Sequence, residues 1–222
     1  MDTDIARIEQ MMTAVTGDLK HDGSTRSILE VLWVLYDRVL RYDASNPKSE
    51  ERDRFVLSKG HGPLALYTIL AVKGFFSPEL LPTFGKWESM LGFHPDRNQV
   101  PGVEASTGSL GHGFPMAVGM AMALRIKKSQ SRVFVLIGDG ECNEGSVWET
   151  ILFAGNQHLP NLTCILINNH SSSQDLGDIA AKFRAFGWVA TTINGRSDEE
   201  IYEALMRRDG MEGPGVVVAE IH

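Results

Sequence analysis

The sequence predicts a single α/β domain built on a mostly parallel sheet with helices on both faces. Its 222 residues and its hydrophobic fraction of 43% are typical of one globular domain with a sizeable core. From residue 132 onward, short apolar runs alternate with amphipathic segments, which is the pattern of βα units joined by right-handed crossovers. The runs are apolar throughout, so both faces of the sheet are expected to be covered. No repeat or linker divides the chain, and we expect one domain over 1–222.

The first half of the chain is predicted to hold four helices around one strand. The helices are expected over 4–18, from Ser24 or Thr25 to Leu40, over 63–72 and over 111–126, where apolar or small residues recur at helical spacing. The short apolar run at 55–57 predicts a buried strand. Four prolines interrupt 75–110, which predicts a long loop with short helical pieces, and long ordered loops often carry function.

The second half alternates regularly between the two kinds of element. Strands are expected over 133–137, 162–167, 188–192 and 216–221, and helices over 147–157, 179–186 and 199–207. Because one helix separates each pair of strands, the strands are expected to run parallel.

Charge and composition exclude several classes of protein. The 21 Lys and Arg residues against 28 Asp and Glu residues give a net charge of -7, which argues against a broad nucleic-acid or anionic-membrane surface. No apolar run reaches the ~18–20 residues of a membrane span, and the first ten residues lack the pattern of a signal peptide. Cys142 and Cys164 form no CxxC pair, which fits a reducing compartment, so we expect a cytoplasmic protein.

Two consecutive strand ends carry side chains that favour a divalent cation. Asp139 follows the strand at 133–137, and Asn169 follows the next strand. Ligands of open parallel sheets bind beyond the carboxyl ends of the strands, so these two groups are expected to face one small volume. Carboxylate and amide oxygens suit Mg²⁺ or Ca²⁺, and Mg²⁺ usually takes its other ligands from water and a substrate phosphate.

The residues around Asp139 favour a phosphate group at the same place. Gly138 and Gly140 let backbone N–H groups approach phosphate oxygens closely, and the helix that follows adds positive potential at its start. Taken alone, a GDG sequence is a common tight turn, and Asn often ends a strand. The combination of acid, flanking glycines, helix and a second polar strand end favours a metal and diphosphate site.

At this point the sequence resembles the diphosphate-binding domain of thiamine diphosphate enzymes, in which GDG is followed about thirty residues later by Asn. Within that superfamily it resembles transketolase over nearly the whole chain. Four motifs in the family's order carry the resemblance: SKGHG from Ser58, HPD from His94, GVEASTGSLGHG from Gly102 and GDGECNEG from Gly138.

The resemblance implies a role for each matched residue. Mg²⁺ would be held by Asp139, Asn169 and the backbone carbonyl near Ser171. Contacts to thiamine diphosphate would come from His61, Gly108, Leu110, Gly138, Asp139, Gly140, Glu141 and Asn169. The catalytic set would be His21, His61, His94 and Glu144, with Glu144 at the dimer interface. Histidine suits such work because its ordinary pKa lies near neutral pH and its neutral ring both donates and accepts.

The resemblance also implies a partner chain. Enzymes of this type resemble one another in holding the cofactor between a diphosphate domain and a pyrimidine domain, and only the first is found in this sequence. The expectation is the N-terminal subunit of a split transketolase, which transfers a two-carbon ketol unit from a ketose or ketose phosphate to an aldehyde. A C-terminal subunit would carry the pyrimidine domain, and the assembly is expected to be a heterotetramer.

Two departures from the family leave alternatives open. The sequence stops before the family's Lys-Gly-rich segment with its histidine, and NNHSSSQDLG replaces the usual stretch around Asn169. One alternative is a subunit of a 2-oxo acid decarboxylating or acyloin-forming enzyme, or a relative of the deoxyxylulose phosphate synthases. Another is a non-catalytic regulatory relative, although a scaffold has no need of a metal pair. His112 is expected to be structural or beside the cofactor, and Cys142, at a helix start where a thiol pKa can fall, is expected to be filler.

Overall fold

A five-stranded parallel sheet forms the centre of the molecule. The structure is a computed structural model, and it describes residues 2–15, 22–207 and 212–222. The strands are β1 (Arg54–Leu57), β2 (Val133–Gly138), β3 (Leu162–Asn168), β4 (Val189–Asn194) and β5 (Gly215–Glu220). Their order is β1-β2-β3-β5-β4, and every neighbouring pair is parallel. The predicted fold class is therefore confirmed.

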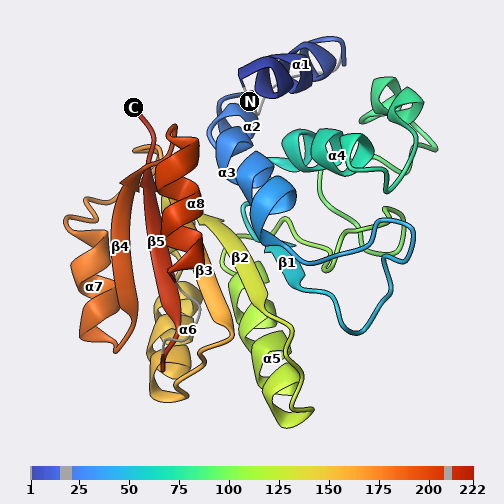
Figure 1. Ribbon diagram of the computed structural model, residues 1–222. Helices are drawn as coiled ribbons and strands as arrows, with labels where there is room; N and C mark the ends of the chain where they lie inside the picture. Colours follow the sequence, from blue (N-terminus) through green and yellow to red (C-terminus); the bar gives the residue numbers. More distant parts are fainter. Residues whose placement is uncertain (1, 16–21, 208–211) are drawn as a thin grey trace.

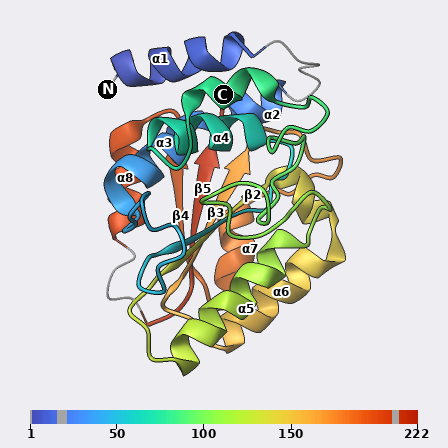
Figure 2. The same ribbon diagram turned by 90° about the vertical axis from the view of Figure 1, so that its right-hand side faces the viewer.

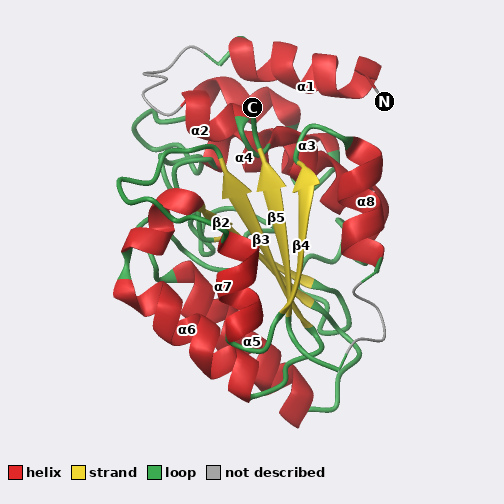
Figure 3. Cartoon of the chain, turned by 90° about the vertical axis from the view of Figure 1, so that its left-hand side faces the viewer, coloured by secondary structure: helices red, strands yellow, loops and turns green. Residues whose placement is uncertain are grey.

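Helices cover both faces of the sheet. One face carries α5 (Gly113–Ile126), α6 (Gly145–Asn156) and α7 (Ile179–Ala185), and the other carries α3 (Leu29–Val34), α4 (Pro63–Val72) and α8 (Asp198–Met206), as Figures 1 and 3 show. The remaining helical pieces are α1 (Asp2–Thr13), α2 (Asp22–Arg26), the π-helical turn Leu35–Val39 and the 3-10 turns Pro78–Thr83 and Asp139–Asn143.

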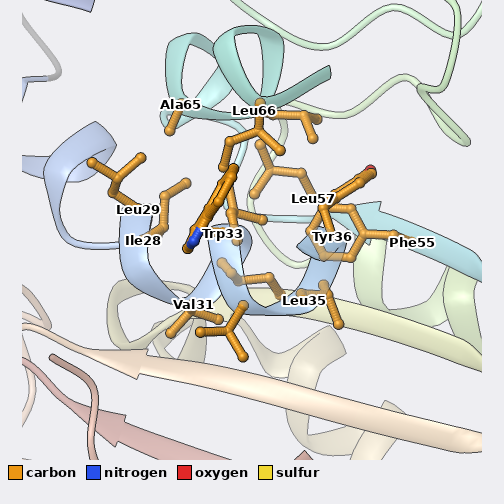
Figure 4. Close-up of a cluster of buried hydrophobic side chains, with 14 of the residues drawn as sticks. Ile28, Leu29, Val31, Trp33, Leu35, Tyr36, Phe55, Leu57, Ala65 and Leu66 are labelled. Atoms are coloured by element: carbon orange, nitrogen blue, oxygen red, sulfur yellow. The ribbon is translucent and has the colours of Figure 1, made fainter. Parts of the chain in front are cut away.

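Strands β1, β2, β3 and β5 contribute alternate side chains to two separate apolar clusters, whereas β4 lies at the edge of the sheet and is only partly buried. In β2, Phe134 and Leu136 face the α3, α4 and α8 side, whereas Val133, Val135 and Ile137 face the α5, α6 and α7 side. Figure 4 shows the centre of the first cluster, where Trp33 of α3 packs between α4 and β1. This double burial explains why these four strands are apolar without alternation, and partial burial explains the threonines of β4, which depart from the expected apolar run.

The helix predicted from Ser24 or Thr25 to Leu40 is the main difference between expectation and structure. The structure divides it into α2, α3 and a π-helical turn, in which the Leu40 N–H donates to the Leu35 carbonyl. The Ser27 hydroxyl donates to the Ser24 carbonyl, and Ile28 departs from ideal α-helical angles with φ -115° and ψ -2°. A serine that bonds its local backbone competes with regular helix, which gives the physical reason for the break.

Other boundaries differ by a few residues. Helix α1 ends at Thr13, earlier than the predicted 4–18, whose last residues lie outside the described part of the chain. Strand β4 begins at Val189 and extends to Asn194, two residues beyond its prediction. The stretch from 75 to 110 is irregular apart from the turn Pro78–Thr83, as its prolines predict. Within the described residues, no helix has both the length and the apolar character needed to cross a bilayer.

All strands point toward the same end of the molecule. Figure 2 shows the arrowheads of the central strands directed toward α2 and α4. The segments that follow β1, β2 and β3 therefore meet at one edge of the sheet, where the sequence places its candidate residues.

Candidate functional site

The exits of β2 and β3 bring the predicted metal ligands together. Gly138, the last residue of β2, pairs with Ile167 of β3, so Asp139 and Asn169 follow directly on adjacent strands. Asp139 is fully buried, and Asn169 is half-buried. The juxtaposition expected from strand order is present.

A set of hydrogen bonds holds the carboxylate of Asp139 in place. It accepts from the Gly140 N–H at 2.8 Å, from the Ser171 N–H and hydroxyl at 2.6 Å each, and from the Ser172 N–H at 3.2 Å. His170, which lies between Asn169 and Ser171 in the sequence, adopts a left-handed backbone conformation with φ 55°. Residues other than glycine rarely adopt this conformation. This strained residue turns the loop so that two successive N–H groups face Asp139.

The side chain of Asn169 supplies the observation that tests whether a cation fits. Its Oδ1 is buried and accepts no hydrogen bond from the described residues. An unsatisfied buried carbonyl oxygen is costly unless a missing partner completes it. The Asp139 carboxylate follows the neighbouring strand β2, and the Ser171 carbonyl lies near Gly140, so the oxygens present are the hard ligands that Mg²⁺ prefers. The residues therefore fit a magnesium ion.

A polar cavity of about 440 Å³ opens beside these groups. Its wall includes Asp139, Asn168, His170 and the loop residues 172–177. Asn168 donates to both oxygens of Glu220 at 3.1 and 2.9 Å, which joins the exits of β3 and β5 at the cavity wall. The volume suits a small phosphorylated ligand.

Two predicted histidines lie against each other near the exit of β1. The ring centroids of His61 and His94 are 5.8 Å apart with a tilt of 56°. The His94 ring lies on Gly108, because a Cβ placed there would come within 2.8 Å of its Cδ2. The backbone of Gly60 touches Gly108 in the same way, at 2.7 Å from a built Cβ to the Gly108 Cα. Glycine is required at 60 and 108 so that three separated motifs can meet.

Hydrogen bonds fix the segments that carry this pair. The Tyr67 hydroxyl donates to the His94 carbonyl at 2.9 Å, and the Thr107 hydroxyl donates to the Leu57 carbonyl at 2.6 Å. Tyr67 is buried in α4 and Leu57 ends β1, so rigid elements position both sides of the histidine pair.

Glu141, a predicted cofactor contact, is a buried carboxylate that links three segments of the site. Its carboxylate accepts from the Ser58 hydroxyl at 2.6 Å and from the N–H groups of Gly111 and Gly138, each at 3.1 Å. It is 1% exposed, and burial raises its pKa, although these hydrogen bonds oppose the shift. Glu141 thus joins the exits of β1 and β2 to the loop before α5.

Lys59 is a residue of the site that the sequence analysis missed. It is only 6% exposed, and its Nζ donates to the Ser27 hydroxyl at 2.9 Å. Burial lowers its pKa to about 8, while the carboxylates of Asp139 and Glu141 oppose the shift. The SKGHG motif contains Lys59, but a lysine is usually exposed, and only the fold shows that this one is buried.

The remaining predicted residues lie around these groups. Glu144 is exposed at the start of α6 beside Gly111, and Leu110 lies in the loop between the histidine pair and α5. The ring Nδ1 of His112 lies 2.9 Å from the Leu110 carbonyl. His21 lies outside the described residues.

Cys142 is buried, as its expected role of filler requires. Burial, with the carboxylates of Glu141 and Asp139, raises the pKa of its thiol to about 12. The idea that the helix start could lower this pKa is therefore wrong, because desolvation of the thiolate outweighs the helix dipole.

Comparison with known proteins identifies the family. Residues 4–218 match the family model described as "Transketolase, thiamine diphosphate binding domain". The chain is 48% identical over 213 residues to "Ferredoxin fas2" of Rhodococcoides fascians, a match that covers 95% of this chain and 70% of that protein. It is 41% identical over 200 residues to the 6-deoxy-6-sulfo-D-fructose transketolase subunit SqwG of a Clostridium strain, covering 87% of this chain and 73% of the relative.

Longer transketolases share the same fold. Human transketolase is 36% identical over 207 residues, which cover 90% of this chain but 33% of the human protein. A transketolase structure from Pichia stipitis, with sedoheptulose-7-phosphate, superposes with a TM-score of 0.86 at 25% identity over 99% of this chain and 36% of that chain. The chain thus spans about a third of these longer proteins. The matched family model, the shared fold and the polar strand ends agree, and the chain belongs to the transketolase thiamine diphosphate binding domain family.

Proposed function

We propose that this chain is the diphosphate-binding subunit of a split transketolase, active together with a second subunit that carries the pyrimidine domain. The assembly would transfer a two-carbon ketol unit from a ketose or ketose phosphate to an aldehyde. The observation that carries the proposal is the Oδ1 of Asn169, which is buried and accepts no hydrogen bond from the described residues. Asn169 directly follows β3, Asp139 directly follows the neighbouring β2, and the His61–His94 pair lies near the exit of β1.

Relatives support the division into subunits. SqwG and an apulose-4-phosphate transketolase chain from Phocaeicola vulgatus are both named as subunits, and this chain covers 73% and 69% of their lengths. The name of the Rhodococcoides relative does not transfer, because the clusters of ferredoxins are held by four cysteine thiolates and this sequence has two cysteines, both buried. We therefore favour transketolase over the 2-oxo acid and regulatory alternatives.

We propose that Asp139, Asn169 and the Ser171 carbonyl hold Mg²⁺, which in turn binds the diphosphate of the cofactor. The cofactor contacts would come from His61, Gly108, Leu110, Gly138, Asp139, Gly140, Glu141 and Asn169. When bound, thiamine diphosphate supplies the carbon nucleophile and stabilises the transferred two-carbon unit. Glu141 would act by positioning, because three donors engage its carboxylate and, among the described residues, the cavity wall includes Asp139 but not Glu141.

The histidines would handle protons at substrate oxygens. A neutral imidazole accepts a proton at one nitrogen and donates from the other, so neighbouring rings can serve two hydroxyl groups of a ketose. His61 and His94, 5.8 Å apart between centroids, have the spacing for this task, and His21 is proposed as a third member. Glu144 is proposed to contact a neighbouring subunit, which its exposed position at the start of α6 allows. We also propose a cytoplasmic heterotetramer.

Purification from the native host with Mg²⁺ and thiamine diphosphate, followed by native mass spectrometry, tests the assembly. We expect a stoichiometric partner chain and retained cofactor mass. The complex is then assayed for ketol transfer from sugar phosphates, with pyruvate as the competing donor. Pyruvate consumption without ketol transfer would overturn the proposed reaction, and ketol transfer by this chain alone at a comparable rate would overturn the split assembly.

Substitution of Asp139 distinguishes an enzyme from a scaffold. Asp139→Asn keeps the size of the side chain but removes the charge that would hold the cation, so cofactor retention and ketol transfer should both fall at least tenfold. Asp43→Asn, in the exposed loop between Leu40 and β1, is the matched control and should retain both. Equal activity in the two variants would contradict a role for Asp139 in the enzyme.

A further inference from the structure

The side chain of Lys59 lies along the end of the site where the diphosphate is proposed to bind. Lys59 follows Ser58 at the exit of β1, and its aliphatic stem passes over Gly138 at the exit of β2. A Cβ placed on Gly138 would lie 3.1 Å from the lysine Cδ and 3.4 Å from its Cε. Lys59 therefore fills the space that a side chain at 138 would need, directly before Asp139.

The ammonium group is held in the protein interior. Its Nζ donates to the hydroxyl of Ser27, which is 3% exposed and lies at the break between α2 and α3. The stem of Lys59 passes over Gly138, so its charge lies near the carboxylates of Asp139 and Glu141, one and three residues further on, which are 0% and 1% exposed. The cluster of Ser27, Lys59, Asp139 and Glu141 thus joins three strand or helix ends around one buried cation.

The Lys59 ammonium group can offset negative charge at the proposed diphosphate site. A diphosphate brings several negative charges to a place where Asp139 and Glu141 already carry two, and Mg²⁺ offsets only part of the sum. Repulsion between like charges is strong in a site shielded from water. A fixed ammonium group near both carboxylates reduces this repulsion without occupying a position in the metal's coordination shell.

We propose that Lys59 is a positioning residue for the diphosphate end of the site: held by Ser27, it offsets the charges of Asp139 and Glu141 so that a magnesium diphosphate group can bind beside them. This inference rests on the proposed function. It assigns a role to a residue that need not touch the substrate, and it explains why the break at Ser27 lies next to the site.

Calorimetric titration of the purified chain and its co-purified complex tests the inference. The probes are thiamine diphosphate and inorganic pyrophosphate, each with Mg²⁺. Lys59→Met, which keeps the length of the stem, should bind both probes at least tenfold more weakly than wild type. Lys127→Met removes a lysine that is 65% exposed at the end of α5, and it should bind both probes like wild type.

A second substitution separates charge from structure. Lys59→Arg keeps the positive charge but changes the shape of the head group, so its affinity for both probes should stay at least threefold above that of Lys59→Met. A merely structural role for Lys59 predicts that the two substitutions weaken binding equally, and equal weakening would overturn the inference. If Lys59→Met does not fold, Ser27→Ala decides, because it removes the hydrogen bond that holds the Lys59 Nζ and should weaken binding of both probes at least threefold. Unchanged affinity of Ser27→Ala would then overturn the inference.

The two proposals fail in different ways. Wild-type chain and complex that bind neither probe would overturn the proposed function and this inference with it. Wild-type protein that binds both probes, together with a Lys59→Met variant of unchanged affinity, would overturn the inference alone. The melting temperature of each variant without ligand identifies any loss of affinity that comes from partial unfolding.

Discussion

At the scale of the single residue, Asn169 combines a cost to folding with a use in binding. Its buried Oδ1 accepts no hydrogen bond from the described residues, which costs free energy in the absence of a cation. Asn169→Ala should therefore leave the stability of the ligand-free chain within about 1 kcal/mol of wild type. The same change removes a proposed metal ligand, so the Mg²⁺ concentration needed for cofactor binding should rise at least tenfold.

Urea unfolding and a magnesium titration of cofactor binding measure the two effects. Asn156→Ala, on the exposed surface of α6, is the control and should change neither by more than a small amount. A large loss of stability in Asn169→Ala with unchanged magnesium dependence would show that the amide serves the fold and not the metal.

Asp53, in contrast to Asn169, is a buried polar residue whose side-chain oxygens are paired with two arginines. Its side chain is unexposed and accepts from the side chains of Arg41 and Arg132, at 2.9 and 2.8 Å for the closest contacts. Burial alone would raise the pKa of Asp53, but the hydrogen bonds from Arg41 and Arg132 prevail and lower it. Asp53→Asn should cost about 2–3 kcal/mol at neutral pH, less than for a fully buried pair because Arg41 is 56% exposed.

The pH dependence of this cost follows from the sign of the shift. The folded-state pKa lies below the ordinary value, so the stability from Asp53 is present above about pH 4 and is lost as pH falls through the folded-state pKa. The difference in unfolding free energy between wild type and Asp53→Asn should shrink as pH falls from about 5 toward 3. Glu51→Gln, an exposed change two residues earlier, serves as the control. A difference that stays constant over this range would contradict the assigned pKa shift.

At the scale of the element, helix α5 depends on its first glycine but not on a later one. A Cβ on Gly113 would lie 2.6 Å from the Ser58 Cβ and 2.7 Å from its Cα, so α5 begins directly against the exit of β1. A Cβ on Gly119, in the same helix, would meet nothing within 4 Å. Gly113→Ala should destabilise the chain by about 1–3 kcal/mol, whereas Gly119→Ala should stabilise it by roughly 0.5–1 kcal/mol.

Thermal or urea unfolding of the two variants gives a direct comparison, since both make the same chemical change in one helix. Gly113→Ala should also weaken cofactor binding, because Ser58 donates to Glu141 and would be displaced. Equal stability of the two variants would mean that α5 can move away from β1 without cost.

At the scale of the whole molecule, helices α5 and α6 together expose several large apolar side chains. The two helices lie side by side in Figure 2, and Met116, Leu152 and Phe153 are 38%, 48% and 46% exposed. The segment at Glu144, directly before α6, matches the region where the resemblance implies a dimer interface. We expect the purified chain to self-associate through this face.

Phe153→Glu tests this expectation, because a charge in the centre of an apolar contact is costly to bury. Analytical ultracentrifugation should show concentration-dependent association of wild type and mainly monomer for Phe153→Glu. Val189→Glu changes an equally apolar residue, 38% exposed, on the edge strand β4, and should associate like wild type. Unchanged association of Phe153→Glu would place the contact elsewhere.

The sequence predicted the fold class and the order of the elements because double burial leaves a continuous apolar run in β1, β2, β3 and β5. It also predicted that Asp139 and Asn169 meet, since parallel strands joined by one helix end at the same edge of the sheet. The predicted ends of helices and strands differ from the structure where a side chain bonds its local backbone, as Ser27 does, and where a strand such as β4 is only partly buried.

By itself, then, the sequence determined the family motifs, the parallel sheet and the pair of polar strand ends, because these depend on local periodicity and chain order. Only the tertiary structure decided which polar groups are buried and what partners they have. It shows Lys59 inside the protein beside Ser27, Glu141 engaged by three donors, and Asn169 with a free oxygen lone pair among the described residues. Burial and pairing arise from contacts between segments far apart in the chain, and no local pattern of residues records them.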